Sequence, residues 1–180
     1  YSKRGEAYFN LGQPELALAD FNRAIALAPG NSTALSWRAY LLEKRGDIDS
    51  AIADYSSAIS NDPAYAYPFL RRAQLRFSRG ELDAALADYN AAVDLTPDNA
   101  EAYVSRGIIF RTKGQVDAAI ADYSKAISLS PDYPLAYFNR AVAYAKSERH
   151  DLAVADYNKV IELTPGEPLA YYNKALSLDQ

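Results

Sequence analysis

ALADFNRAIALAP occupies residues 17–29, and its arrangement of residue types returns at four later places in the chain. The copies read AIADYSSAISNDP at 51–63, ALADYNAAVDLTP at 85–97, AIADYSKAISLSP at 119–131 and AVADYNKVIELTP at 153–165. Consecutive copies follow one another with a constant 34-residue spacing, without insertion or deletion. Each copy carries alanine, aspartate, an aromatic residue, alanine or valine, and a closing proline at fixed offsets. A period of this length indicates an array of repeated structural units.

Each copy predicts an amphipathic helix that ends close to its proline. In the first copy, Ala17, Phe21 and Ala24 recur at intervals of four and three residues, which places them on one helical face. Pro29 limits the helix, because a proline ring lacks the N–H that a longer helix would need. The same spacing in the segment before the next copy, seen at Leu35 and Ala39, predicts another helix there. Each repeat is therefore expected to be a first and a second helix.

The turn between the two helices carries glycine in four repeats: Gly12, Gly46, Gly80 and Gly114. Glycine at this place predicts a tight turn, because it adopts positive φ angles without steric cost. In the fifth repeat Glu148 takes the place of the glycine, and we expect a somewhat different turn there.

Numbering each repeat from the position of Ser32 divides the chain into 34-residue units. Full repeats cover 32–65, 66–99, 100–133 and 134–167, and residues 1–31 form a first repeat that lacks its first three positions. Residues 168–180 supply one further, terminal helix. We expect residues 1–180 to form a single array, because stacked helix pairs bury faces that one pair alone cannot bury.

The composition excludes several classes of function. A formal net charge of −4 gives no basic footprint for nucleic acid. No uninterrupted apolar segment approaches the ~18 residues of a membrane-spanning helix, so we expect no membrane insertion and a soluble protein. The sequence does not name its compartment, and both cytoplasm and periplasm stay open. Cysteine is absent, which excludes disulfides and thiolate metal sites. Methionine is absent too, which suggests that Tyr1 follows an internal cut or a processed segment.

The sequence offers no constellation for catalysis. Its one histidine, His150, stands in the turn region of the fifth repeat, without a carboxylate or nucleophile pattern around it. No phosphate-binding glycine loop, H-E-x-x-H helix or G-x-S-x-G element occurs. We therefore expect a non-enzyme that needs no cofactor and no metal.

The fixed positions resemble the tetratricopeptide repeat. The resemblance rests on the 34-residue period, a small residue at position 8, alanine at 20, an aromatic residue at 24, a small residue at 27 and proline at 32, and it covers the whole chain. It implies an all-α fold, a right-handed superhelical solenoid of antiparallel helix pairs. It also implies a concave face built mainly from the first helices.

Two charged columns accompany this framework. Position 23 is always aspartate (Asp20, Asp54, Asp88, Asp122, Asp156), and position 7 is always basic (Arg4, Arg38, Arg72, Arg106, Arg140, Lys174). Each column adjoins a framework position, so we expect Asp–Arg pairs that fix the register of the helices. The alternative interpretation, a charged stripe for a partner, remains open.

The concave-face positions implied by the resemblance do not repeat, unlike the framework, which suggests that they carry recognition. They include Trp37, the only tryptophan, and other residues of types enriched at binding hot spots. The predicted peptide-binding residues are Trp37, Tyr40, Tyr67, Leu70, Arg71, Gln74, Phe77, Val104, Ser105, Ile108, Arg111, Phe138, Asn139, Val142 and Tyr172.

Two specialised binding modes known in tetratricopeptide proteins do not fit this face. The clamp that holds a C-terminal carboxylate in chaperone cofactors needs Lys, Asn, Asn, Lys and Arg at set positions. Starting from the first repeat, only Arg71 matches, and starting from the fourth, only Asn139 does. The asparagine column of O-linked N-acetylglucosamine transferase is matched only by Asn139 and Asn173.

The sequence thus predicts a protein–protein interaction scaffold that holds a peptide segment of a partner along its concave groove. Two other functions remain open. The terminal helix exposes Leu169, Tyr172 and Leu176, which could join copies end to end as a homo-oligomer. The chain could also be a regulatory or substrate-recruiting module of a larger enzyme.

Overall fold

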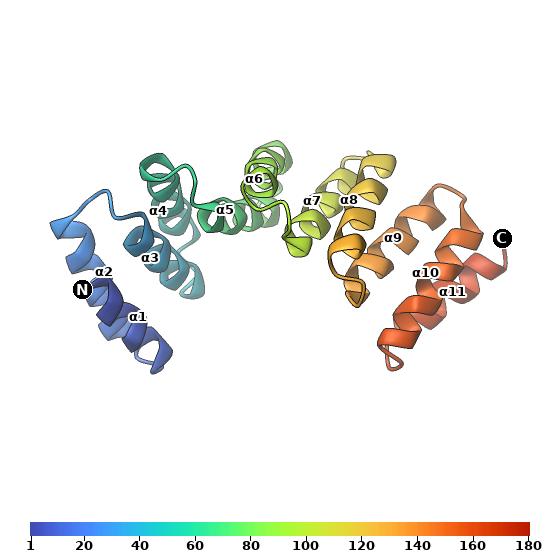
Figure 1. The fold of residues 1–180 in the computed structure, drawn as a ribbon, viewed down its shortest axis with the longest axis horizontal. Helices are drawn as coiled ribbons and strands as arrows, with labels where there is room; N and C mark the ends of the chain where they lie inside the picture. Colours follow the sequence, from blue (N-terminus) through green and yellow to red (C-terminus); the bar gives the residue numbers. More distant parts are fainter. The chain divides into compact units, whose positions relative to one another are not determined.

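The structure, a computed structural model, describes all residues 1–180 and contains eleven helices and no strand (Figure 1). The helices are α1 (Ser2–Asn10), α2 (Pro14–Leu27), α3 (Ser32–Lys44), α4 (Ile48–Asn61), α5 (Ala66–Ser78), α6 (Leu82–Leu95), α7 (Ala100–Thr112), α8 (Val116–Leu129), α9 (Pro134–Lys146), α10 (His150–Leu163) and α11 (Pro168–Leu178). The chain forms two compact units, Tyr1–Leu95 with α1 to α6 and Thr96–Gln180 with α7 to α11. That residues 1–180 act as one array remains a prediction.

The odd-numbered helices from α3 to α11 are the first helices, and they begin at the residues where the repeats begin. Local sequence explains these starts. Asn31 and Asn99 cap α3 and α7 by accepting the backbone N–H of Ala34 and Ala102. Pro134 and Pro168 open α9 and α11, where a missing N–H costs nothing.

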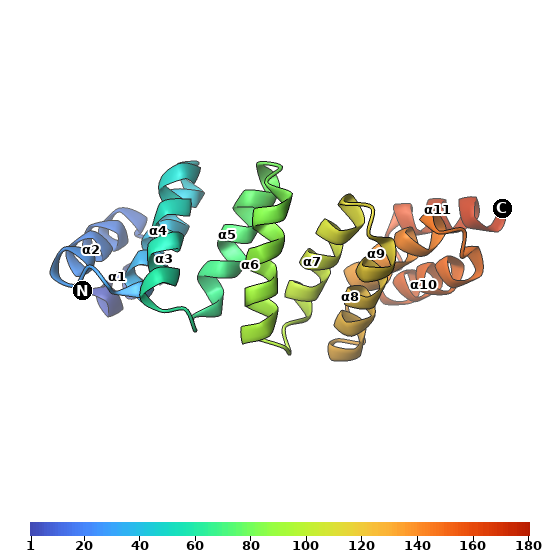
Figure 2. The ribbon, with the colours of Figure 1, turned by 90° about the horizontal axis from the view of Figure 1, so that it is seen from above.

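Within each unit, a second helix packs against the first helix of its own repeat and against the first helix that follows it (Figure 2). The aromatic column fills the space between paired helices: Phe21, Tyr55 and Tyr123 are 0% exposed. A Cβ atom added at Gly107 would lie 2.6 Å from the Tyr123 ring. The small residue at position 8 therefore leaves room for the aromatic ring of the same repeat, as the sequence predicts.

The Arg–Asp columns form the pairs that the sequence predicts, each joining the two helices of one repeat. In all five repeats the arginine donates two hydrogen bonds to one carboxylate. The aspartates are buried, between 3% and 8% exposed. At Asp20 the hydrogen bond from Arg4 lowers the pKa of the carboxyl. Paired hydrogen bonds in a planar fork fix the two helices in one relative register.

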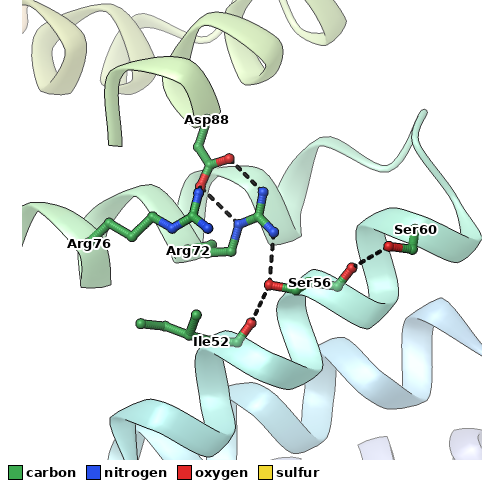
Figure 3. Close-up of polar contacts among 6 residues, drawn as sticks. All are labelled: Ile52, Ser56, Ser60, Arg72, Arg76 and Asp88. Carbon is green, nitrogen blue, oxygen red and sulfur yellow. Dashed lines mark hydrogen bonds and ion pairs between the residues drawn. The ribbon is translucent and has the colours of Figure 1, made fainter. Parts of the chain in front are cut away.

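The same arginines also reach the second helix of the preceding repeat. Arg72 donates to Ser56 Oγ at 2.8 Å, and Arg140 donates to Ser124 Oγ at 3.0 Å. Figure 3 shows the first of these contacts together with the Asp88 carboxylate, on which Arg72 and Arg76 of α5 converge. One guanidinium thus connects three consecutive helices.

The turn of the fifth repeat differs from its prediction. Glu148 adopts a φ of 60°, in the left-handed region that the turn glycines occupy at 70° to 83°. Its N–H bonds to the carbonyl of Ala145, just as the N–H of Gly46 bonds to that of Glu43. The prediction of a different turn was wrong, because the helix pair fixes the turn and glutamate adopts the strained angle at a cost of about 1 kcal/mol.

We expect Asp88→Ala to lower the free energy of unfolding by about 3 kcal/mol, because it strands two partly buried guanidinium groups. Glu15→Ala, which removes the exposed partner of Arg45, is the control and should cost no more than about 1 kcal/mol. Urea denaturation followed by circular dichroism measures both. Equal losses for the two variants would contradict a structural role for the buried pairs.

Candidate functional site

The first unit carries a cluster of aromatic rings on its first helices. Trp37 lies with its ring centroid 5.1 Å from that of Phe9 and 6.3 Å from that of Tyr40. It also stacks on the buried Phe21, with 6.0 Å between centroids and planes 2° apart. Trp37 is therefore partly a core residue, anchored on one face by Phe21 and left partly exposed.

A closed polar network stands beside this cluster. Arg71 of α5 forms an ion pair with Glu43 of α3 and donates to Gln74 Oε1 at 2.8 Å. Glu43 also accepts a hydrogen bond from the Tyr55 hydroxyl at 3.3 Å. Burial raises the pKa of Tyr55, so this hydroxyl stays protonated and donates. The one carboxylate of Glu43 therefore satisfies two donors, Arg71 and Tyr55.

A cavity of about 220 Å³ opens between consecutive first helices of this unit, α3 and α5. Its lining residues are Ser36, Trp37, Tyr65 and Tyr67. Tyr65 and Tyr67 stack on each other with centroids 6.1 Å apart. Three of the four lining residues are aromatic, and all four carry a hydroxyl or an indole N–H group.

The second unit has a cavity of about 350 Å³ between α9 and α11, lined by Pro134, Leu135, Phe138, Val160, Thr164, Glu167 and Leu169. Three of these residues stand at the repeat positions of three lining residues in the first unit. Phe138, Glu167 and Leu169 correspond to Ser36, Tyr65 and Tyr67, each three repeats further along the chain. The same place in the repeat therefore forms a cavity in both units.

The polar network of the first unit has an altered counterpart in the second. Each residue of the network has a counterpart two repeats later. Arg111 corresponds to Glu43, Asn139 to Arg71, Val142 to Gln74 and Tyr123 to Tyr55. The Asn139 amide turns back to its own helix and donates to the carbonyl oxygen of Leu135 at 2.9 Å. The buried Arg111 Nε and Tyr123 hydroxyl have no hydrogen-bond partner. The acid that closes the network in the first unit is thus replaced by a base.

Family models for known repeats match most of the chain. Two models described as tetratricopeptide repeat match residues 2–66 and 134–166, and one described as TPR repeat matches residues 73–114 and 107–148. The chain is a tetratricopeptide repeat protein. Tetratricopeptide repeat proteins are typically non-catalytic scaffolds for protein interaction. No curated protein sequence gives a significant match.

Solved structures share this all-α solenoid fold. YrrB, described as a TPR protein with an unusual peptide-binding site, is 21% identical and superposes with a TM-score of 0.86, covering 97% of this chain and 90% of its own. TTC0263 of Thermus thermophilus is 25% identical with a TM-score of 0.65, covering 99% and 97%. The first TPR of Spaghetti (RPAP3), bound to the HSP90 peptide SRMEEVD, is 24% identical with a TM-score of 0.62, covering 63% and 90%.

The tetratricopeptide fold places the predicted peptide-binding residues in three kinds of environment. Trp37, Tyr40, Tyr67, Leu70, Arg71, Gln74, Phe77, Ser105, Ile108, Arg111, Phe138 and Val142 are partly buried, Val104 and Asn139 are buried, and Tyr172 is exposed. Trp37, Tyr67 and Phe138 line the two cavities. Val104 is only 1% exposed and Asn139 only 7%, so both offer a partner little surface.

Several cavity residues lie outside the predicted set. Tyr65 and Glu167 occupy the last position of a repeat, just before a first helix begins, whereas the implied concave-face positions all lie inside the first helix. Leu135 and Leu169 stand at concave-face positions and are 47% and 58% exposed. Leucine recurs at position 2 in the fifth repeat and in the terminal helix, and this recurrence is the sequence signal that could have identified Leu135 and Leu169.

No helix combines the length and apolar character needed to cross a bilayer.

We expect Tyr55→Phe to lower the free energy of unfolding by about 1 kcal/mol, because it removes a hydrogen bond to Glu43. Tyr123→Phe is the matched variant in a repeat where the hydroxyl has no partner. It should cause no loss, and a gain of up to about 1 kcal/mol, because a buried, unpaired hydroxyl is removed. Chemical denaturation of the two variants compares them directly, and equal losses would contradict the difference between the two networks.

Proposed function

We propose that this protein binds peptide segments of partner proteins on its first helices, with peptide side chains entering the cavity of each unit. The observation that carries the proposal is the recurrence of a cavity at one position of the repeat, between consecutive first helices. Ligand sites are typically concave and mostly apolar, with a few polar groups that fix orientation. Both cavities have this character.

The volumes favour side chains as occupants. A cavity of about 220 Å³ or 350 Å³ has room for one or two large side chains, and these volumes lie below or at the lower end of the roughly 300–1,000 Å³ that pockets for drug-sized ligands span. Leu135 and Leu169, about half exposed at the rim of the larger cavity, would bury apolar surface against an entering side chain. The peptide-binding descriptions of YrrB and of the first TPR of Spaghetti are consistent with this use of the fold.

The polar residues are not equal contributors to such binding. Arg71 and Gln74 are already engaged by Glu43 and by each other. The charge of Arg71 is thus already neutralised by Glu43, and the carbonyl oxygen of Gln74 is occupied. Affinity is therefore expected to come from the cavity aromatics and leucines, which include Trp37, Tyr67 and Phe138.

Peptides selected from a display library test the proposal. The double variant Leu135→Lys, Leu169→Lys should weaken the affinity of the selected peptides at least about tenfold, because it removes apolar burial worth more than ~1.4 kcal/mol. The matched control is Leu16→Lys, Leu152→Lys, which changes two leucines on second helices that are 50% and 48% exposed. It should change affinity less than about twofold.

Fluorescence polarisation with labelled peptide measures both double variants after circular dichroism has shown that they are folded. Equal weakening by the two would show that added positive charge, and not the cavity, affects binding. Unchanged affinity in both would place the peptide site elsewhere on the molecule.

Self-association is a second candidate, favoured by the exposed apolar side chains of α11. Tyr172 is 62% exposed, Leu176 48% and Leu178 64%. If copies of the chain associate through this helix, sedimentation velocity should show an average mass that rises with concentration. Leu176→Glu should abolish the rise, while Leu152→Glu on α10 should leave it unchanged. A concentration-independent monomer mass would exclude this candidate.

A further inference from the structure

In the second unit, α7 and α8 each carry one buried hydrogen-bond donor without a partner. They are the Nε–H group of Arg111 on α7 and the hydroxyl of Tyr123 on α8. A guanidinium nitrogen can only donate, so it needs an oxygen atom of another group. Arg111 forms no ion pair with a carboxylate, unlike the arginines at position 7 of the repeats. What this place lacks is an acceptor, and preferably a negatively charged one.

The two donors lie close to one another. They stand at the repeat positions at which the Tyr55 hydroxyl reaches the Glu43 carboxylate in the first unit, 3.3 Å apart. In agreement with this placement, the Arg111 guanidinium opposes the rise that burial causes in the pKa of Tyr123. A tyrosine hydroxyl is protonated at neutral pH, so that of Tyr123 can donate. Tyr123 is 0% exposed and fixed by packing, whereas the longer Arg111 side chain is only half-buried and can change rotamer.

The first unit shows which group fits at this position. There a carboxylate, that of Glu43, occupies the place of Arg111. It accepts a hydrogen bond from the Tyr55 hydroxyl and pairs with Arg71. In the second unit a tyrosine and an arginine are again present, but the carboxylate is missing.

We propose that Arg111 and the Tyr123 hydroxyl bind one carboxylate group of the bound peptide, in the way that Glu43 is held in the first unit. The inference rests on the proposed function, because the carboxylate belongs to the bound peptide. Such a peptide places either an acidic side chain or its C-terminal carboxylate at Arg111 and Tyr123.

The surroundings favour one negative charge over a phosphate. Val142 stands where the first unit has Gln74, and Asn139 bonds to its own helix, so neither supplies a further donor. One guanidinium and one hydroxyl match a singly charged carboxylate, whereas a phosphate with nearly two charges usually gathers several cationic donors. The site also differs from the carboxylate clamp excluded above, whose positions in this chain carry neither of these two residues.

Small carboxylates test the site without any peptide partner. N-acetyl-glutamic acid α-amide presents only a side-chain carboxylate, N-acetyl-alanine presents only a C-terminal one, and N-acetyl-glutamine amide is the neutral control. At constant ionic strength, we expect one or both carboxylates to shift the NMR signal of Arg111 Nε–Hε in a saturable way. The neutral amide should not. The carboxylate that saturates at lower concentration identifies the source.

Three variants connect the response to this pair. Arg111→Gln should abolish saturable shifts of backbone amides in α7, and Tyr123→Phe should weaken binding at least about threefold. Arg149→Gln is the matched control, since it removes one positive charge from an exposed pair with Asp117 in the same unit and should leave binding unchanged. If the Arg111 signal responds no more than that of Arg149, or if Tyr123→Phe changes nothing, the proposal is overturned.

Arg111→Glu supplies a second readout that needs no ligand. It places a carboxylate at the position that Glu43 occupies, within reach of the Tyr123 hydroxyl, so Tyr123→Phe should lower the melting temperature more in the Arg111→Glu variant than in the unmodified chain. No coupling between the two substitutions would overturn the proposed geometry. Failure of peptide binding through the cavities would leave these outcomes unaffected, so failure of the proposed function and failure of this site are distinguishable.

Discussion

The buried pair between arginine at position 7 and aspartate at position 23 is the interaction on which the rest of the structure depends. An aspartate that is less than one-tenth exposed is tolerated only when its charge is compensated by well-directed donors. The planar guanidinium meets this need with two parallel hydrogen bonds and so sets the register of the two helices. In Arg72 and Arg140 the remaining nitrogen reaches Ser56 or Ser124 on the preceding second helix, which couples neighbouring repeats within a unit.

A framework fixed in this way leaves other first-helix positions free to vary. Two pairs of neighbouring repeats use the same four positions differently. Around Glu43 the charges of the acid and of Arg71 neutralise each other. Around Arg111 the internal acid is absent, and two donors remain unsatisfied. The scaffold thus presents an aromatic cavity in one unit and an apolar cavity in the other, where an unpaired arginine is also present.

Part of the candidate site could be predicted from the sequence. Trp37, Tyr67 and Phe138 were identified because they are large apolar residues at irregular concave-face positions, and they line the cavities. Val104 and Asn139 met the same criterion of position, yet they are buried. The period specifies which face of a helix a residue lies on. It does not specify how closely the next helix covers that face, because this depends on the volumes of side chains from other repeats.

The polar residues show a further limit. Arg71 and Arg111 are equally plausible binding residues in the sequence, but Arg71 pairs with Glu43 of the preceding repeat, whereas Arg111 has no such partner. Pairing across helices depends on the residue at one position of the neighbouring repeat. Two changes between the networks, acid to base at position 12 and arginine to asparagine at position 6, together reverse the availability of the charge.

The sequence by itself determined the helices, their pairing and the Arg–Asp contacts, which recur in every repeat, and the turn glycines, which recur in four, because each depends on short-range geometry. Only the tertiary structure decided where cavities open, that Glu148 adopts the same turn as glycine, and which donors stay without an acceptor. The physical reason is that space and hydrogen-bond satisfaction are properties of several helices packed together, and no periodic pattern in one segment specifies them.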